Sequence, residues 1–198
     1  MSLSTIWPVA WTVLFYGWFA GEIFIGIKTR TRRSSGTVRD RGTLQLLWIT
    51  MLVAITCGIW ISEEQGPNLP SGPIIFGTSW LKFAAILIMA SGLLIRWTAV
   101  VSLGKSFSSN VAIHATQTVL KTGLYRWMRH PSYTGLLLCV FAVALHTRNF
   151  IAMPIVFLPT AAALMWRMHV EEIALRSAFG EEYIQYSRET KRLIPGIF

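Results

Sequence analysis

The stretch LQLLWITMLVAITCGIWI, residues 44–61, contains no charged side chain. A bilayer core about 30 Å thick is crossed by about 20 helical residues, so this stretch predicts a membrane-spanning helix. Apolar residues also fill four other long blocks, at residues 6–27, 80–100, 132–146 and 150–166. The order of these blocks predicts an all-α integral membrane protein with about five transmembrane helices.

The composition supports this prediction. Of the 198 residues, 53% are hydrophobic and 14% are charged, and the mean hydropathy is +0.50. Soluble domains carry about 25% charged residues, so a water-soluble fold is disfavoured. The first basic residue is Lys28, so the N-terminal block lacks the charged start of a signal peptide and is expected to remain as a span.

The last two apolar blocks are separated by residues 147–149 alone, which predicts a helical hairpin near the C-terminus. The fourth block is only about 22 Å long at 1.5 Å per residue, which is short for a complete crossing. Pro154 and Pro159 are expected to bend the fifth helix, because proline removes a backbone donor. In the third block, Lys82 and Arg96 lie near the two ends and are expected to extend toward the membrane surface.

Basic residues gather between the apolar blocks. The net charge of +9 and the pI near 10.2 could suggest a nucleic-acid partner, but no reading motif is present and a nucleic-acid role is disfavoured. Basic loops face the cytoplasm. The first connection contains Lys28, Arg30, Arg32, Arg33, Arg39 and Arg41. We therefore expect an extracytoplasmic N-terminus and a cytoplasmic C-terminal tail.

The tail after residue 171 has a helical pattern as far as about Ser187. Phe179, Tyr183 and Tyr186 recur at helical spacing, which predicts a cytoplasmic amphipathic C-terminal helix. The two tyrosines are expected to anchor this helix at the headgroup level rather than to contact a ligand.

The cysteines and histidines do not indicate a metal site or a disulfide. Cys57 and Cys139 each lie inside an apolar block. The four histidines, at positions 114, 130, 146 and 169, are dispersed and do not pair with cysteines or carboxylates at zinc spacing. We therefore expect no metal ion.

Two polar stretches lie against the predicted spans. They are TVLKTGLYRWMRHPSYTG at residues 118–135 and WRMHVEEIALRSAFGEEYIQY at residues 166–186. Ionisable groups beside a bilayer core are costly, so such groups are functional candidates. Simpler roles exist for some of them. Arg126 and Arg129 could only indicate the cytoplasmic end of a span, and Glu172 could be a solvated neighbour of Glu171.

These stretches resemble the isoprenylcysteine carboxyl methyltransferase family and its phospholipid methyltransferase-like relatives. The resemblance rests on four motifs in order: Gly123-x-Tyr125, Arg129-His130-Pro131-Ser132-Tyr133-x-Gly135, Glu171-Glu172 and Phe179-Gly180-Glu181-Glu182-Tyr183-x-x-Tyr186. It implies one membrane methyltransferase domain over residues 1–198. Three N-terminal spans would lie within residues 1–100, and the cofactor-binding and catalytic region within residues 101–198.

The resemblance also implies a site for S-adenosylmethionine at the cytoplasmic surface. The implied cofactor contacts are Ile113, Gln117, Thr118, Val119, Leu120, Tyr125, His130, Pro131, Ser132, Tyr133 and Glu171. The residues implied in the chemistry are Arg167, at the position that holds the acceptor carboxylate, together with Glu171 and His130.

The chemistry of these side chains fits the implied roles. The methionine end of the cofactor has an ammonium group and a carboxylate, which Glu171 and His130 could bind. The sulfonium is a cation that the faces of Tyr125 and Tyr133 could stabilise. A guanidinium such as Arg167 binds a carboxylate through two parallel hydrogen bonds.

Three functions remain open at this stage. The preferred function is methyl transfer to the carboxylate of a lipophilic, prenylcysteine-like acceptor, either a small molecule or a lipidated peptide, in contact with membrane lipids. A phospholipid or other amine N-methyltransferase would have the same His-Pro and Glu-Glu pattern. A membrane scaffold without activity would leave the polar cluster unexplained. The sequence does not indicate the oligomeric state.

Overall fold

The structure is a computed structural model that describes residues 3–29, 37–38, 42–63, 78–104, 107, 112–113 and 118–198. Its long helices are α1 (Leu3–Thr29), α2 (Thr43–Glu63), α3 (Thr78–Leu103), α4 (Pro131–His146) and α5 (Ala152–Phe179). The structure also has two short helices, η2 (Gly123–Arg126) and α6 (Glu181–Glu189), which lie at one end of the bundle. The predicted all-α class is confirmed. The short strands β1 (Thr37–Val38) and β2 (Ala112–Ile113) form one antiparallel pair.

Among the described residues, four helices are long and apolar enough, by length and composition, to cross a membrane: α1, α2, α3 and α5. The fourth apolar block forms α4, which at 16 residues is shorter than these spans. Each predicted apolar block therefore corresponds to one long helix. Pro131 begins α4, where a proline costs no intrahelical hydrogen bond.

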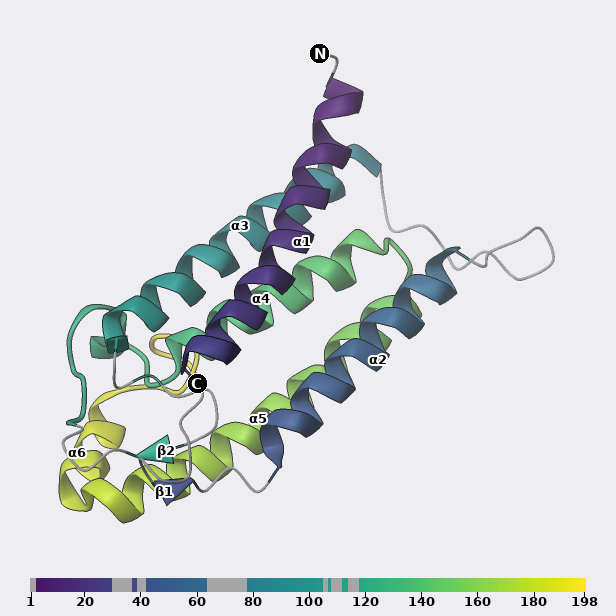
Figure 1. The fold of residues 1–198 in the computed structure, drawn as a ribbon. Helices are drawn as coiled ribbons and strands as arrows, with labels where there is room; N and C mark the ends of the chain where they lie inside the picture. Colours follow the sequence, from purple (N-terminus) through teal and green to yellow (C-terminus); the bar gives the residue numbers. More distant parts are fainter. Residues whose placement is uncertain are drawn as a thin grey trace.

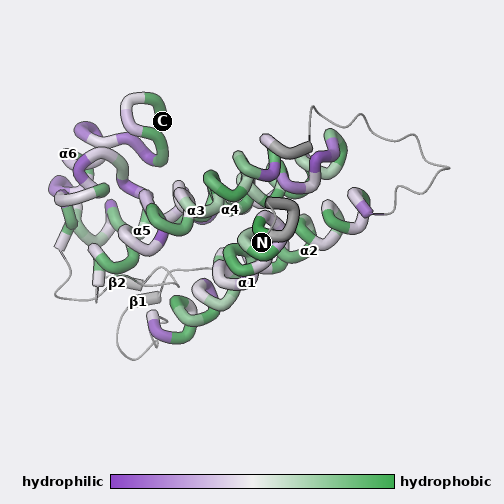
Figure 2. The backbone as a smooth tube through the Cα atoms, turned by 90° about the horizontal axis from the view of Figure 1, so that it is seen from above, coloured by the Kyte–Doolittle hydropathy of each residue, from purple (hydrophilic) through white to green (hydrophobic). Residues whose placement is uncertain are grey.

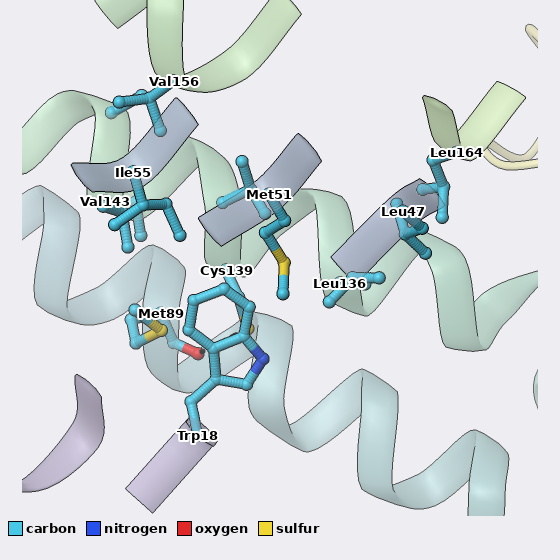
Figure 3. Close-up of a cluster of buried hydrophobic side chains, with 13 residues drawn as sticks. Trp18, Leu47, Met51, Ile55, Met89, Leu136, Cys139, Val143, Val156 and Leu164 are labelled. Carbon is cyan, nitrogen blue, oxygen red and sulfur yellow. Dashed lines mark hydrogen bonds between the residues drawn. The ribbon is translucent and has the colours of Figure 1, made fainter. Parts of the chain in front are cut away.

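The helices form one bundle in which α3 packs along α4 and α2 packs along α5 (Figure 1). Helix α4 also packs against α5 and so joins the two pairs, while α1 packs on α3. The buried core between them includes Trp18, Met51, Met89, Leu136 and Cys139 (Figure 3).

Two glycines set the distance between α3 and α4. A Cβ on Gly135 would lie 2.6 Å from the backbone nitrogen of Arg96 and from the carbonyl oxygen of Gly92. A Cβ on Gly92 would lie 2.8 Å from the carbonyl oxygen of Gly135. Small residues of this kind allow membrane helices to pack backbone against backbone. The crossing places Arg96 beside the first turn of α4.

Helix α5 is longer than the predicted fifth span at residues 150–166. It begins at Ala152. Just before this start, Asn149 Oδ1 accepts hydrogen bonds from the backbone nitrogens of Ile151 and Ala152, over 2.8 and 3.1 Å. It ends at Gly180, whose φ of 54° suits glycine. The tail predicted as helical from residue 171 to about Ser187 is helical but is divided at Gly180: its first part continues α5 to Phe179, and its second part is the C-terminal helix α6.

The prolines of α5 differ in position. Pro154 lies in the first turn, where no hydrogen bond is lost, so the bend expected there is wrong. Pro159 lies inside the helix, and the bend predicted at that residue stays a prediction.

Hydrophilic residues gather at one end of the bundle, around α6 and the C-terminal segment, whereas the long helices are mainly hydrophobic (Figure 2). The N-terminal end of α1 lies at the opposite end of the molecule (Figure 1). The polar end contains the residues that the sequence analysis selected.

Candidate functional site

An open cavity lies at the polar end of the bundle. Its walls come from all five long helices, from η2 and α6, and from residues 118–120. One part of the wall is polar, and residues of α4 and α5 dominate it. The other part is apolar and comes mainly from α1 and α2, through Ile25, Gly26, Leu44, Leu47, Trp48 and Met51.

Arg167, Tyr133 and Glu171 form a hydrogen-bonded chain in the polar wall. Arg167 Nε donates to Tyr133 Oη over 3.0 Å, and Tyr133 Oη donates to Glu171 Oε2 over 2.6 Å. Arg167 is almost fully buried, and its Nη1 also donates to Thr43 Oγ1 over 3.0 Å. Arg167 and Glu171 lie one helical turn apart on α5, so both side chains reach the same cavity.

Glu172 lies next to Glu171 but has a different environment. Its carboxylate is 2% exposed and accepts hydrogen bonds from Arg129 Nε at 3.0 Å and from Arg192 Nη2 at 2.9 Å. The reading of Glu172 as a solvated neighbour was therefore wrong. Glu172 connects α5 to the start of α4 and to the C-terminal segment.

The C-terminal segment is attached to the residues before α4 by its backbone. Arg129 N donates to Lys191 O over 2.8 Å, and His130 N donates to Arg192 O over 3.0 Å. The guanidinium of Arg129 also donates to carbonyls at the end of α6, those of Ser187 and Thr190. These bonds hold α6 over the polar wall of the cavity.

His130 lies between these two groups of contacts. Its ring stacks on Tyr133 with centroids 5.4 Å apart, and its Nε2 is 3.5 Å from Glu172 Oε1. This buried Nε2 has no hydrogen-bond partner among the described residues. The Glu172 carboxylate lies close to this nitrogen, and His130 itself lines the cavity.

Tyrosines close the outer part of the cavity. Tyr186 Oη donates to the carbonyl oxygen of Tyr125 over 2.7 Å, and Tyr125 Oη donates to Ala99 O over 3.3 Å. Burial raises the pKa of Tyr186 to about 12, so this phenol remains a donor at neutral pH. Tyr183 and Tyr186 are both buried and line the cavity, so their predicted role as headgroup anchors is wrong.

A buried ion pair lies at the junction of the polar and apolar walls. Arg96 Nε and Nη2 donate to the two oxygens of Glu22 over 2.8 and 2.7 Å. Arg96 Nη1 donates to the hydroxyl of Ser132. The expectation that Arg96 extends toward the membrane surface was wrong, because Glu22 of α1 supplies a buried counter-charge.

Most of the predicted site residues lie around this one cavity. Those that line it are Thr118, Val119, Leu120, Tyr125, His130, Ser132, Tyr133, Arg167 and Glu171. Pro131 is buried at the start of α4 and does not line it. Ile113 lies in β2, where the structure describes only its backbone, and Gln117 lies outside the described residues.

Several lining residues were not predicted. Glu22 and Arg96 are opposite charges inside two apolar blocks, and this signal could have predicted their pairing. Arg192, which holds Glu172 but does not line the cavity, gave no comparable signal, because its contact with Glu172 depends on the path of the last residues. Among the described residues, no three histidines, cysteines or carboxylates lie close enough to hold a metal ion.

Comparison with known proteins locates the same region. Residues 84–177 match the sequence model of the isoprenylcysteine carboxyl methyltransferase (ICMT) family. Over 126 residues the chain is 31% identical to the human protein-S-isoprenylcysteine O-methyltransferase. This alignment covers 60% of this chain and 43% of the human protein. The corresponding protein of Schizosaccharomyces pombe is 30% identical over 156 residues. This second alignment covers 75% of this chain and 66% of the yeast protein.

A solved structure has a similar fold. The eukaryotic intramembrane Ras methyltransferase ICMT superposes with a TM-score of 0.60 and 25% sequence identity, over 76% of this chain and 52% of that protein. Together with the apolar helices, this likeness supports an integral, multi-pass membrane protein. The matched region contains α4, most of α5 and the residues that line the polar wall. Over residues 84–177 the chain therefore matches the isoprenylcysteine carboxyl methyltransferase family.

Proposed function

We propose that this protein transfers the methyl group of S-adenosylmethionine to the carboxylate of a lipophilic, prenylcysteine-like acceptor. The observation that carries the proposal is the single cavity with a polar wall around Arg167 and Glu171 and an apolar wall from α1 and α2. An acceptor with an ionised head and an isoprenoid tail matches both walls. The family relationship supports the same reaction class.

The polar wall fits the proposed methyl donor. Glu171 offers a carboxylate for the donor's ammonium group, and the imidazole of His130, which lies beside Glu172 and lines the cavity, offers a polar group to its carboxylate. Tyr125 and Tyr133 offer ring faces for a sulfonium cation. When bound, the donor supplies an electrophilic methyl group. Thr118, Val119 and Leu120 are then the neighbours for its adenosine.

Arg167 would bind the acceptor carboxylate. Its buried guanidinium is held by Tyr133 and Thr43, so its orientation is fixed before the acceptor arrives. An ionised carboxylate is itself a nucleophile, so the reaction needs alignment and exclusion of water rather than a general base. The protein would contribute mainly by holding the two reactants in line.

We also place the polar end of the bundle on the cytoplasmic side. Residues 28–41, between α1 and α2, contain six basic residues against Asp40 alone. Short loops rich in lysine and arginine remain cytoplasmic. Both the donor and a lipidated peptide would then reach the cavity from the cytoplasm, while the acceptor's tail stays in contact with the bilayer.

A transfer assay with Arg167 variants tests the reaction and its acceptor together. Purified protein receives labelled S-adenosylmethionine and either a prenylcysteine or an aminolipid acceptor. Arg167→Lys keeps the charge and loses the planar fork, so kcat/KM for the prenylcysteine should fall roughly 10- to 100-fold, because charged hydrogen bonds contribute about 1.5–3 kcal/mol. Affinity for the demethylated donor product should change little.

Arg176→Lys is the matched control, because Arg176 lies on the same helix and does not line the cavity. It should leave kcat/KM unchanged. Normal turnover of prenylcysteine by both Arg167→Lys and Arg167→Ala would defeat the role of Arg167. Transfer to aminolipids that persists or rises in the Arg167 variants would identify an amine N-methyltransferase, because the guanidinium that repels a protonated amine has been removed.

A further inference from the structure

The apolar part of the cavity ends abruptly inside the bundle. On α2 the lining residues run along one face from Leu44 to Met51, which is about 10 Å at 1.5 Å per residue. On α1 the lining ends at Glu22, and on α4 it ends at Leu136. Three helices therefore stop contributing to the cavity at a similar depth.

The next residue on the same face of α1 is Trp18, one turn beyond Glu22. Trp18 is 1% exposed and does not line the cavity. Its indole ring belongs to one buried cluster with Met51 and Leu136, and Met51 points toward it from α2 (Figure 3). A tryptophan from α1 thus fills the space between α1 and α2 directly behind the end of the cavity.

The environment of this indole is unusual for a simple core residue. Trp18 Nε1 is buried without a hydrogen-bond partner among the described residues. Buried tryptophans usually find a partner for this N–H, so the protein accepts a cost to keep a large ring here. A smaller apolar residue would avoid that cost but would leave space behind Met51.

We propose that Trp18, Met51 and Leu136 form an end stop that limits the length of the acceptor's apolar tail. This inference rests on the proposed function for the identity of the acceptor. A tail that lies along α1 and α2 gains affinity with each buried carbon until it meets Met51, with Trp18 behind it. Since each buried methylene contributes roughly fourfold in affinity, the stop sets the isoprenoid length at which this gain ends.

Equilibrium binding of three ligands tests the stop. The ligands are N-acetyl-S-geranyl-, S-farnesyl- and S-geranylgeranyl-cysteine, whose tails differ by one isoprene unit at each step. The full chain is used in one detergent throughout. Each ligand then partitions into the micelles to the same extent with wild type and variant, so this effect cancels in the ratio of their affinities. Because the apolar face on α2 is only about 10 Å long, Met51→Ala and Trp18→Leu should each raise the affinity for the farnesyl ligand relative to the geranyl ligand by about tenfold.

Met89→Ala is the matched control for Met51→Ala. Both methionines belong to the same buried cluster and are at most 1% exposed, but only Met51 lines the cavity. Met89→Ala should therefore lose similar stability and keep the wild-type length preference. An equal change of preference in Met89→Ala would overturn the stop, because it would indicate general loosening of the core.

A filling variant gives an independent result. Gly26 lines the apolar wall, and a Cβ on it would meet no atom within 4 Å. Gly26→Leu should fold and weaken binding of all three ligands, the longest most. Gly17→Leu, on the same helix and equally free of neighbours but away from the cavity, should not weaken binding.

Methyl transfer by the same preparations separates this inference from the proposed function. If the length preference shifts in binding but no prenylcysteine is methylated, the stop stands and the proposed reaction is wrong. If methylation occurs while Met51→Ala and Trp18→Leu keep the wild-type preference within twofold, the reaction stands and the stop is wrong. If wild type binds none of the three ligands, the stop is also wrong.

Discussion

Glu171 and Glu172 are neighbours in the sequence, but α5 directs them to different surroundings. Successive residues of a helix point about 100° apart, so only one of the pair can face the cavity. Glu171 accepts a hydrogen bond from Tyr133 in the cavity wall. Glu172 holds Arg129 and Arg192 and so connects three segments. The two identical side chains therefore differ in position: Glu171 lines the cavity, and Glu172 supports the structure around it.

The first prediction concerns this division. Glu171→Gln should weaken binding of S-adenosylhomocysteine by about 1–3 kcal/mol, because an ammonium group would lose its anionic partner. Its thermal stability should change little. Calorimetry on folded protein measures the affinity, and wild-type affinity in Glu171→Gln would remove Glu171 from the donor site.

The matched variant Glu172→Gln should behave in the opposite way. Removal of one partner from a buried ion pair costs about 3–5 kcal/mol, because Arg129 would remain charged and only partly bonded. The unfolding temperature should therefore fall clearly more than in Glu171→Gln. Equal stability of the two variants would show that Glu172 does not hold the C-terminal segment.

At the residue scale, the sequence predicted the members of the site better than their partners. The types and order of His130, Tyr133, Arg167 and Glu171 were enough to select residues that now lie around one cavity. The role of Glu172 depended on which face of α5 turns inward and on the path of residues 190–198. Neither is encoded in the local pattern around the two glutamates.

At the scale of elements, the position of α4 determines the site. The contact between Gly92 and Gly135 allows α3 and α4 to touch through their backbones, which brings Arg96 to Ser132. Apolar blocks predicted these helices because hydrophobic length is a local property. They did not predict the end of α5, because a helix continues after it leaves the apolar region, until Gly180 ends it.

The second prediction tests the helix crossing. Gly135→Ala would place a methyl group 2.6 Å from backbone atoms of α3, so the helices must separate. Overpacking of this kind costs about 1–3 kcal/mol, and movement of Arg96 and Ser132 should also lower methyl transfer. Unfolding temperature and turnover are measured on the same preparation.

Gly17→Ala is the control, because a Cβ on Gly17 meets no atom within 4 Å. It makes the same substitution in a membrane helix and should preserve or slightly raise stability, since alanine favours helix. A loss of stability in Gly17→Ala equal to that in Gly135→Ala would contradict the role given to the crossing.

At the scale of the whole molecule, the cavity lies at the end of an apolar bundle where hydrophilic residues gather around α6 (Figure 2). Five long helices in sequence place the start of α1 and the residues after α5 at opposite ends (Figure 1). The odd number of apolar blocks already implied this arrangement. The cavity itself was not predictable from the sequence, because it depends on how α1 and α2 lie across α4.

The third prediction is the orientation of the bundle. A tag before α1 should be extracytoplasmic and a tag after α6 cytoplasmic, because basic residues gather in the segments at the polar end. Protease protection or thiol labelling of single introduced cysteines in sealed vesicles reports the side of each tag. Detection of both tags on one side would mean that an even number of helices cross the membrane, for example because the shorter α4 does not complete its crossing, and the five-span count would be wrong.

The ion pair between Glu22 and Arg96 has a consequence for biosynthesis. The two residues are 74 positions apart, so α1 leaves the ribosome long before its counter-charge is made. A charged side chain in the middle of a lone membrane helix costs about 2.5–3.5 kcal/mol. Glu22 lies about two turns before the end of α1 and bears part of this cost until α3 inserts and Arg96 arrives. The amino-terminal half of the protein then has a built-in order of assembly, in which α1 reaches its final depth only after α3 has been synthesised.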